Sequence, residues 1–316
     1  MVDRSAAGRL LRTTWQTTLS RGPGYEPLPP GPAFDGGRCG YFVDYSAKTA
    51  RSEPDPVGVP IVQIQRALGW NERATAGDGR GEANFLDACG RLLGAAEPDG
   101  DALLFWYAVP VPKYGLDRRW LSSHAQGQAA SAFTRAYRRT GKDVWAEAAR
   151  SSVVPLLSPT HDLLAATGDG PILEEVPSHP SSQILNGWIT ALWGLLDVGE
   201  TLGDVAARRA FEDGVECLRR RIALYDVGWW TRYSLYPHRV VDLAKPIYHR
   251  FHVTQVELLG RLTDYREFSA AAERWRLYDR TGNRVRALAQ KALFVATRAN
   301  GPSVPVAQTT PGTSPR

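Results

Sequence analysis

The chain has 316 residues, of which 43% are hydrophobic, and its formal net charge is +5 at neutral pH. This length and hydrophobic content predict a globular protein with a sizeable core. No apolar run is long enough to span a bilayer, and no stripe of Lys and Arg with interleaved aromatic residues indicates a nucleic-acid partner. The modest positive charge instead favours an acidic partner.

The cysteines and histidines give no sign of a metal centre. Cys39, Cys89 and Cys217 lie far apart without metal-ligand spacing, so we expect neither a zinc site nor a disulfide framework, and a reducing, cytoplasmic location. His249 and His252 are three residues apart, but without a third ligand they favour a structural pair over a metal site. No glycine-rich dinucleotide pattern follows a strand, so no cofactor is expected.

The N-terminal third predicts an extension followed by mixed elements. Residues 1–39 combine a weak helical pattern with a Pro/Gly-rich stretch, which is typical of an extension lying on a main domain. Residues 40–49 alternate enough to predict a strand or hairpin arm. Helices are expected at 60–70 and 82–95, and a strand or core-lining segment at 102–107.

Paired helices dominate the rest of the chain. Short Gly- or Asp-containing turns separate the members of each pair, and longer segments with Pro, Tyr and His join one pair to the next. This predicts a mainly α fold, an incomplete α/α toroid over residues 40–295 with a small β or irregular N-terminal segment. A helical bundle or a solenoid is the alternative. Residues 296–316 are expected to be a disordered tail. The predicted pairs are 123–139 with 143–157, 181–200 with 204–222, and 254–262 with 265–277.

Residues 174–196 place two acids just before a nearly all-apolar helix. Pro180, Ser181 and Ser182 predict the start of that helix, because Pro fits a first turn and Ser caps free N–H groups. Glu174 and Glu175 would then lie at the mouth of a core. Ordinary solvated acids near a helix N-terminus are the alternative interpretation.

The three long segments between helix pairs hold most of the unusual residues. Such a gathering of aromatic, cationic and imidazole groups favours a binding site, although any single member could be structural. The candidates for binding in these segments are Gln126, Arg232, His238, Lys245, His249 and Arg250.

Four runs of sequence carry a resemblance to a known family. The chain resembles the C-terminal catalytic domain of the heparosan/heparan sulfate D-glucuronyl C-5 epimerases in order and approximate spacing of these runs. The resemblance implies an α/α toroid and an isomerase that inverts C-5 of glucuronic acid units in an acidic polysaccharide, without a cofactor. The runs are SSHAQGQAASAFTRAY at 122–137, EEVPSHPSSQILNGW at 174–188, LYDVGWWTRYSL at 224–235 and YHRFHVTQVELL at 248–259.

The resemblance also implies roles for individual residues. The family's glutamate matches Glu175, and its two loop tyrosines match Tyr233 and Tyr248, so these three are the expected catalytic residues. Asn186 matches an asparagine that is expected to orient the sugar, and Lys245 stands where the family has an arginine. Because a phenol is a poor base at neutral pH, we expect the neighbouring cations Arg232, Lys245 and Arg250 to favour its ionisation.

One position departs from the family pattern and leaves other functions open. The family has a tyrosine directly after the glutamate, whereas this chain has Val176. The alternatives are a polysaccharide lyase of the α/α-toroid type and a catalytically inactive domain that binds acidic glycans. In each case the expected partner is an acidic polysaccharide. The sequence leaves open whether the chain forms a homodimer.

Overall fold

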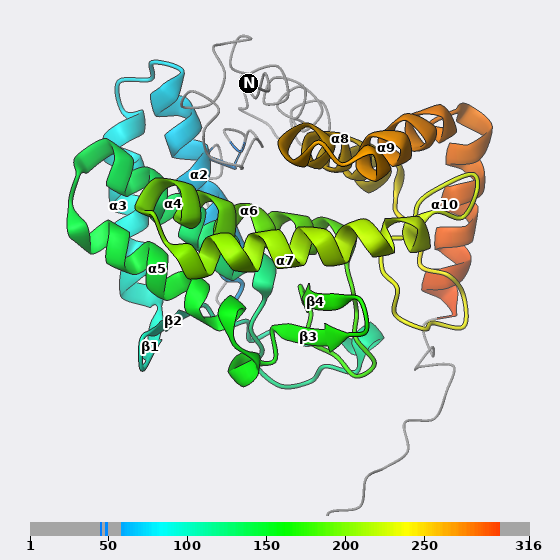
Figure 1. Ribbon diagram of the computed structural model, residues 1–316, viewed down its shortest axis with the longest axis horizontal. Helices are drawn as coiled ribbons and strands as arrows, with labels where there is room; N and C mark the ends of the chain where they lie inside the picture. The colour runs from blue at the N-terminus through cyan, green and yellow to red at the C-terminus, as the bar shows by residue number, and fades with distance from the viewer. Residues whose placement is uncertain (1–44, 46–47, 50–57, 298–316) are drawn as a thin grey trace, which may run out of the picture.

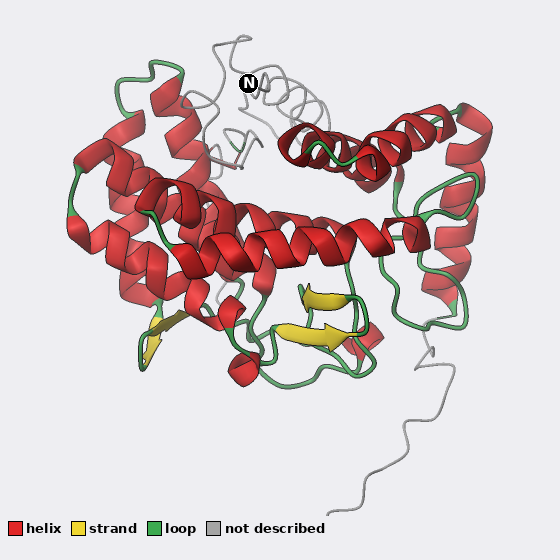
Figure 2. Cartoon of the chain, viewed as in Figure 1, coloured by secondary structure: helices red, strands yellow, loops and turns green. Residues whose placement is uncertain are grey.

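The computed structural model describes Tyr45, Lys48–Thr49 and residues 58–297. Helices dominate this part of the chain, and two short β-hairpins lie beside them (Figure 2). The predicted extension at 1–39, nearly all of the predicted strand at 40–49 and most of the predicted tail lie outside the described residues. No helix in the described part is both long and apolar enough to cross a membrane.

Within the described residues, four helical hairpins form an incomplete α/α toroid (Figure 1). The inner helices α2, α4, α6 and α8 lie in a row, and each packs against its own outer partner. The hairpins are α2 (Pro60–Thr75) with α3 (Gly81–Ala95), α4 (Ser123–Thr140) with α5 (Asp143–Leu157), α6 (Leu185–Leu202) with α7 (Val205–Arg221), and α8 (Pro246–Thr263) with α9 (Arg266–Tyr278).

The predicted helix pairs are therefore confirmed, with two shifted boundaries. The helix predicted from residue 181 begins at Leu185, because Gln183 has a left-handed backbone (φ 47°) that no α-helix continues through. The helix predicted from residue 254 begins at Pro246, where proline occupies the first turn and lacks only an N–H that would have no helical partner. Tyr248 and its neighbours are thus helical.

Strand β2 (Ala102–Leu104) falls within the strand or core-lining segment predicted at 102–107, and it pairs with β1 (Glu97–Asp99) in a hairpin that precedes α4. The hairpin of β3 (Leu164–Thr167) and β4 (Gly170–Leu173), which precedes α6, was not predicted, and neither was the last helix. That helix, α10 (Thr281–Ala296), packs against the segment that leads into α8 through a small cluster of Trp230, Leu243 and Ala287.

The neighbouring inner helices α4 and α6 run in the same direction. Gly127 near the start of α4 faces Ala191 of α6, and Arg135 further along α4 forms a buried ion pair of 2.9 Å with Asp197 further along α6. The starts of α4 and α6 therefore share one rim of the toroid, and their short hairpin turns occupy the other. The start of α8 joins the first rim through Tyr248, whose ring meets that of Tyr233, while the Tyr233 carbonyl accepts a hydrogen bond from Leu185 N at the start of α6.

The contact between α4 and α6 is made backbone to backbone. A Cβ added at Gly194 would fall onto backbone atoms of Gly127, 2.7 Å from its carbonyl carbon, and a Cβ at Gly127 would lie 2.7 Å from Cα of Ala191. Glycine is required here because nothing larger fits between the helices. This close approach fixes the spacing of the two helices that carry the functional rim.

His249, expected to bind substrate, is instead part of the core, so that expectation is wrong. Its ring is fully buried and stacks on Trp230 at 3.8 Å. Nδ1 lies 2.9 Å from the Thr231 hydroxyl and Nε2 lies 3.0 Å from the Trp275 carbonyl. Burial lowers the pKa of His249 to about 4 and, with His249 as a neighbour, lowers the pKa of His252 to about 3.

We predict that Gly194→Ala destabilises the protein by roughly 1–3 kcal/mol or more, because its methyl group would overlap the backbone of α4. Gly90→Ala on exposed α3, where a Cβ meets nothing within 4 Å, is the matched control and should stabilise by up to about 1 kcal/mol through helix propensity. Urea unfolding measures both. Equal effects of the two substitutions would refute the close approach.

The neutral histidines predict a loss of stability in mild acid. The unfolded chain takes up a proton at His249 near pH 6.5 and the folded chain only near pH 4, so the stabilisation is complete above pH 6.5 and declines as the pH falls towards 4. His249 alone should account for about 2 kcal/mol between pH 7 and pH 5. Urea unfolding of the wild type and of His249→Gln at both pH values tests this, and identical pH dependence in the two proteins would contradict it.

Candidate functional site

The rim formed by the starts of α4, α6 and α8 gathers the candidate site residues. Each of these helices is entered through a long segment, at residues 105–122, 174–184 and 226–245. Backbone hydrogen bonds tie the segments together: Ser123 N donates to the Glu174 carbonyl at 3.0 Å, and Leu185 N donates to the Tyr233 carbonyl at 3.3 Å. Residues far apart in sequence therefore meet at one place.

Glu174 is the buried anchor of the segment before α6. Only 2% of the residue is exposed, and its carboxylate accepts hydrogen bonds from the Ser181 hydroxyl, from Ser182 N at 2.9 Å and Oγ at 2.5 Å, and from Gln183 N. Burial raises the pKa of Glu174, and these hydrogen bonds oppose that rise. Because both of its carboxylate oxygens accept hydrogen bonds from this segment, Glu174 fixes the shape of the loop and does not bind a ligand.

Glu175 faces the opposite way, onto the start of α6. Its Oε2 accepts a hydrogen bond of 3.4 Å from Nδ2 of Asn186, and its side chain lies over Gly187, where an added Cβ would be 2.5 Å from Cβ and 2.7 Å from Cδ of Glu175. Its Oε1 lies 3.9 Å from Nδ1 of His124. With 17% of its side chain exposed, Glu175 is held in place and yet accessible.

Asn186 was expected to orient a sugar. The structure places it at the site, but buried at 3% exposure and bonded to Glu175. Its side-chain oxygen Oδ1 has no hydrogen-bond partner within the described residues. The side-chain amide of Asn186 therefore contributes to the site by holding the Glu175 carboxylate.

Tyr233 and Tyr248 meet edge to face beside Glu175. Their ring centroids are 5.2 Å apart, and neither ring is fully covered. Tyr233 is positioned by a backbone hydrogen bond of 2.7 Å to the Asp242 carbonyl, and Tyr248 by the first turn of α8. Burial, followed by the charge of Glu175, raises the pKa of both phenols, that of Tyr233 well above its usual value of about 10. Both are therefore protonated at neutral pH.

The expectation that Arg232 and Arg250 favour ionisation of the phenols is therefore wrong. Arg232 precedes Tyr233 in an extended segment, where successive side chains point to opposite sides, and it lines a separate cavity of about 430 Å³ with Arg221 and Asp226. Arg250 is two residues beyond Tyr248 on a helix and therefore on another face, where its guanidinium lies 3.9 Å from Asp279.

The remaining predicted binding residues divide between scaffold and rim. Gln126 is fully buried and accepts from Phe105 N at 2.9 Å while donating to the Leu103 and Ser152 carbonyls, so it belongs to the scaffold. Lys245 is exposed at the N-cap of α8. His238 lies among aromatic rings at the edge of the site, 5.6 Å from Tyr114, 4.5 Å from Tyr236 and 4.9 Å from Phe294 between centroids.

Sequence reasoning did not single out His124 as a neighbour of Glu175. Its other ring nitrogen, Nε2, lies 2.8 Å from Nε2 of Gln128, which in turn donates to the Tyr45 hydroxyl at 2.9 Å. The spacing of four between His124 and Gln128 on a helix was the available signal, since such residues share a face. Also unforeseen were Lys113 and Lys291, whose ammonium groups lie over the ring of Tyr233.

Val176, the departure from the family pattern, is 5% exposed and packs in the main hydrophobic core. It supplies no phenol to the rim. Within the described residues no group of three or more His, Cys, Asp or Glu side chains is arranged to hold a metal ion.

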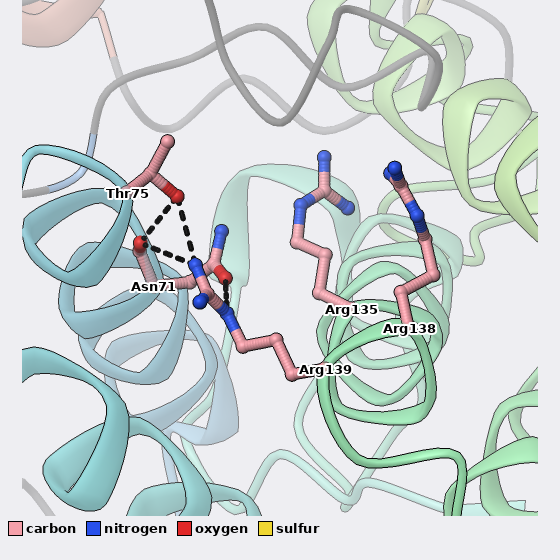
Figure 3. Close-up of a pocket in the computed structure, with 5 residues that line it drawn as sticks. All are labelled: Asn71, Thr75, Arg135, Arg138 and Arg139. Atoms are coloured by element: carbon pink, nitrogen blue, oxygen red, sulfur yellow. Dashed lines mark hydrogen bonds between the residues drawn. The ribbon is translucent and has the colours of Figure 1, made fainter.

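A pocket of about 300 Å³ lies near the other end of α4 and is lined by three arginines (Figure 3). Arg139 is bonded to Asn71 Oδ1 and Thr75 Oγ1 of α2, each at 2.8 Å, and Arg135 to Asp197. Its arginines are 11 to 15 residues beyond His124, roughly 17–22 Å along the helix. This cluster joins helices and is distinct from the rim that holds Glu175.

The segments that form the rim lie within a match to a known protein family. Residues 104–277 match the family described as D-glucuronyl C5-epimerase C-terminus. A D-glucuronyl C5-epimerase of Caenorhabditis elegans is 28% identical over 194 residues, which are 54% of this chain and 31% of the worm protein. An uncharacterised protein of Methanocaldococcus jannaschii is 23% identical over 197 residues, 57% of this chain and 60% of that protein.

Among solved structures, the endo-β-1,4-glucanase CMCax of Acetobacter xylinum aligns with 85% of this chain and 76% of its own, at a TM-score of 0.45 and 15% identity. The chain spans less than two thirds of the length of either curated relative. The family match nevertheless covers more than half of the chain and includes every segment that carries the acid and the phenols. This chain therefore belongs to the D-glucuronyl C5-epimerase C-terminal family.

Proposed function

We propose that this protein inverts C-5 of glucuronic acid units within an acidic polysaccharide of the heparosan type. The observation that carries the proposal is one accessible carboxylate at the rim, Glu175, whose charge acts on two phenols, Tyr233 and Tyr248, that meet edge to face. A carboxylate side chain near protonated phenols supplies both partners that a proton exchange at carbon needs: one group that takes a proton and one that gives one.

Glu175 is proposed as the base. The C-5 hydrogen of a uronate is α to the carboxylate, so its transfer to Glu175 leaves the electron pair of the C–H bond delocalised into that carboxylate as an enediolate-like dianion. Asn186, Gly187 and His124 hold the Glu175 carboxylate in one orientation. Such positioning lowers the activation barrier of proton transfer because the base is already oriented before the reaction.

Tyr248 is proposed as the acid that returns a proton to C-5 from the opposite face, with Tyr233 supporting it. A phenol with a raised pKa keeps its proton at neutral pH and is suited to donate it to a strongly basic carbon centre. After the transfer, the phenolate and the protonated Glu175 exchange protons with solvent and return to their starting states. No bond other than C–H is broken, so no cofactor is needed.

Two other outcomes share this geometry. In a polysaccharide lyase, the same proton abstraction is followed by loss of the O-4 substituent, which gives an unsaturated product that absorbs in the ultraviolet. The buried Val176, in place of the family tyrosine, is the feature that favours a catalytically inactive binding domain. Product analysis separates the three.

We predict that the protein incorporates deuterium at C-5 when it is incubated with heparosan in deuterated water, and that Glu175→Gln lowers the rate by about 10²–10⁴-fold. Tyr248→Phe should lower it to a similar extent. Glu212→Gln, which removes an exposed acid of α7, is the matched control and should leave the rate unchanged. A folded wild type that binds heparosan without any exchange would leave only the binding domain, and an ultraviolet-absorbing product would indicate the lyase.

The contact between Glu175 and Gly187 generates a second prediction. Gly187→Ala forces the Glu175 side chain away from α6, so C-5 exchange should fall about 100-fold, as expected for a displacement on the order of 1 Å. Gly90→Ala is the control for the added methyl group. Exchange rates are compared at matched folded fractions, determined by circular dichroism. Unchanged exchange in Gly187→Ala would mean that the carboxylate over α6 does not take the proton.

A further inference from the structure

A cluster of two lysines on one buried aspartate lies beside the proposed catalytic residues. The Asp242 side chain is fully buried, and it forms ion pairs with Lys113 at 3.5 Å and with Lys291. The lysine side chains remain 32% and 14% exposed. Lys113 comes from a 3₁₀ turn (Pro112–Tyr114) ahead of α4, and Lys291 comes from α10.

Both ammonium groups lie over the ring of Tyr233. Nζ of Lys113 is 4.9 Å and Nζ of Lys291 is 5.4 Å from the ring centroid. The same ring contacts Tyr248 and is affected by the charge of Glu175. The cations and the carboxylate of Glu175 therefore border one small region of the rim.

The cluster carries more positive than negative charge. Asp242 can balance only one of its two lysines, and Lys245 is close enough to add to the repulsion. Burial first, then the charges of Lys113 and Lys245, lower the pKa of Lys291, whereas Asp242 opposes that shift. An anion that binds between these ammonium groups would relieve the repulsion, and buried charges are stable only when they are paired in this way.

We propose that Lys113 and Lys291, held in place by Asp242, bind the carboxylate of the uronic acid unit whose C-5 faces Glu175. This inference rests on the proposed function and adds a substrate subsite to it. When the C-5 proton leaves, negative charge develops on the oxygens of that carboxylate, and two preorganised ammonium groups stabilise it there. Helix α10 lies beyond residues 104–277, so Lys291 is a contribution from outside the family segment.

The experiment measures calorimetric affinity for heparosan oligosaccharides, with carboxyl-reduced and N-sulfated heparosan as comparison ligands. Lys291→Gln and Lys113→Gln should each weaken heparosan binding about tenfold or more, as expected for a lost charge-assisted hydrogen bond. Lys142→Gln, which removes one positive charge from an exposed position at the opposite rim, should leave affinity unchanged. Carboxyl-reduced heparosan should bind weakly to the wild type and be insensitive to Lys291→Gln.

A double variant separates binding from folding. Lys291→Gln alone weakens the pairing of Asp242. Lys291→Gln with Asp242→Asn also removes the buried carboxylate and leaves only the partly exposed Lys113, so it should recover the melting temperature but not the affinity. Recovery of both would show that Lys291 is only structural and would overturn the proposal. Heparosan binding that is unaffected by Lys291→Gln would also overturn it, as would a lysine effect confined to the N-sulfated polymer, which would identify a sulfate as the ligand.

Deuterium exchange at C-5 distinguishes failure of the subsite from failure of the proposed function. Exchange by the wild type with unchanged binding and turnover in Lys291→Gln would reject the subsite and leave the epimerase. Lysine-dependent binding of the carboxylated polymer without any exchange by the wild type would support carboxylate binding by the cluster and reject the epimerase.

Discussion

The buried carboxylate of Glu174 organises the functional rim. Two serine hydroxyls and the backbone N–H groups of residues 182 and 183 converge on it, and this set of hydrogen bonds compensates the cost of taking an acid out of water. The same bonds keep the segment out of helix α6 until Leu185. Because Glu175 follows directly in the chain, a fixed Glu174 places its neighbour over Gly187. Two adjacent acids thus have opposite roles, one as anchor and one as accessible group.

Glu175 is the accessible carboxylate of the rim. Burial, followed by the charge of Glu175, raises the pKa of Tyr233 and Tyr248, so the rim holds an accessible carboxylate and two protonated phenols. The ammonium groups of Lys113 and Lys291 lie over the ring of Tyr233 and provide the opposite charge. A uronate bound between them would present its C–H bond to a carboxylate and its own carboxylate to cations, which is the polarity that proton abstraction at C-5 requires.

The helix pairs were predictable because their apolar spacing and Gly or Asp turns are local signals. The four sequence runs singled out Glu175, Tyr233 and Tyr248, and the structure brings the two tyrosine rings into contact. The errors arose where long-range contacts decide. The sequence around Ser181 resembles a helix cap, but its hydroxyl binds Glu174. The sequence suggested that His249 binds substrate, but its two ring nitrogens lie within hydrogen-bond distance of the Thr231 hydroxyl and the Trp275 carbonyl. Arg232 adjoins Tyr233 in sequence, and alternation of the extended chain directs it elsewhere. Lys291 lies 43 residues beyond Tyr248 in a helix that was not predicted, so no local pattern could connect it with the rim.

A crystal structure with a heparosan oligosaccharide tests the central claim most directly, namely that one uronate lies between Glu175 and Tyr248. The account predicts that a Glu175 oxygen lies about 3–3.5 Å from C-5 on one face of the sugar and the Tyr248 hydroxyl at a comparable distance on the other, as for reacting groups that are poised for transfer. An oligosaccharide seated elsewhere, such as at the arginine pocket of α4, or one with Glu175 and Tyr248 on the same face of its ring, would contradict the account.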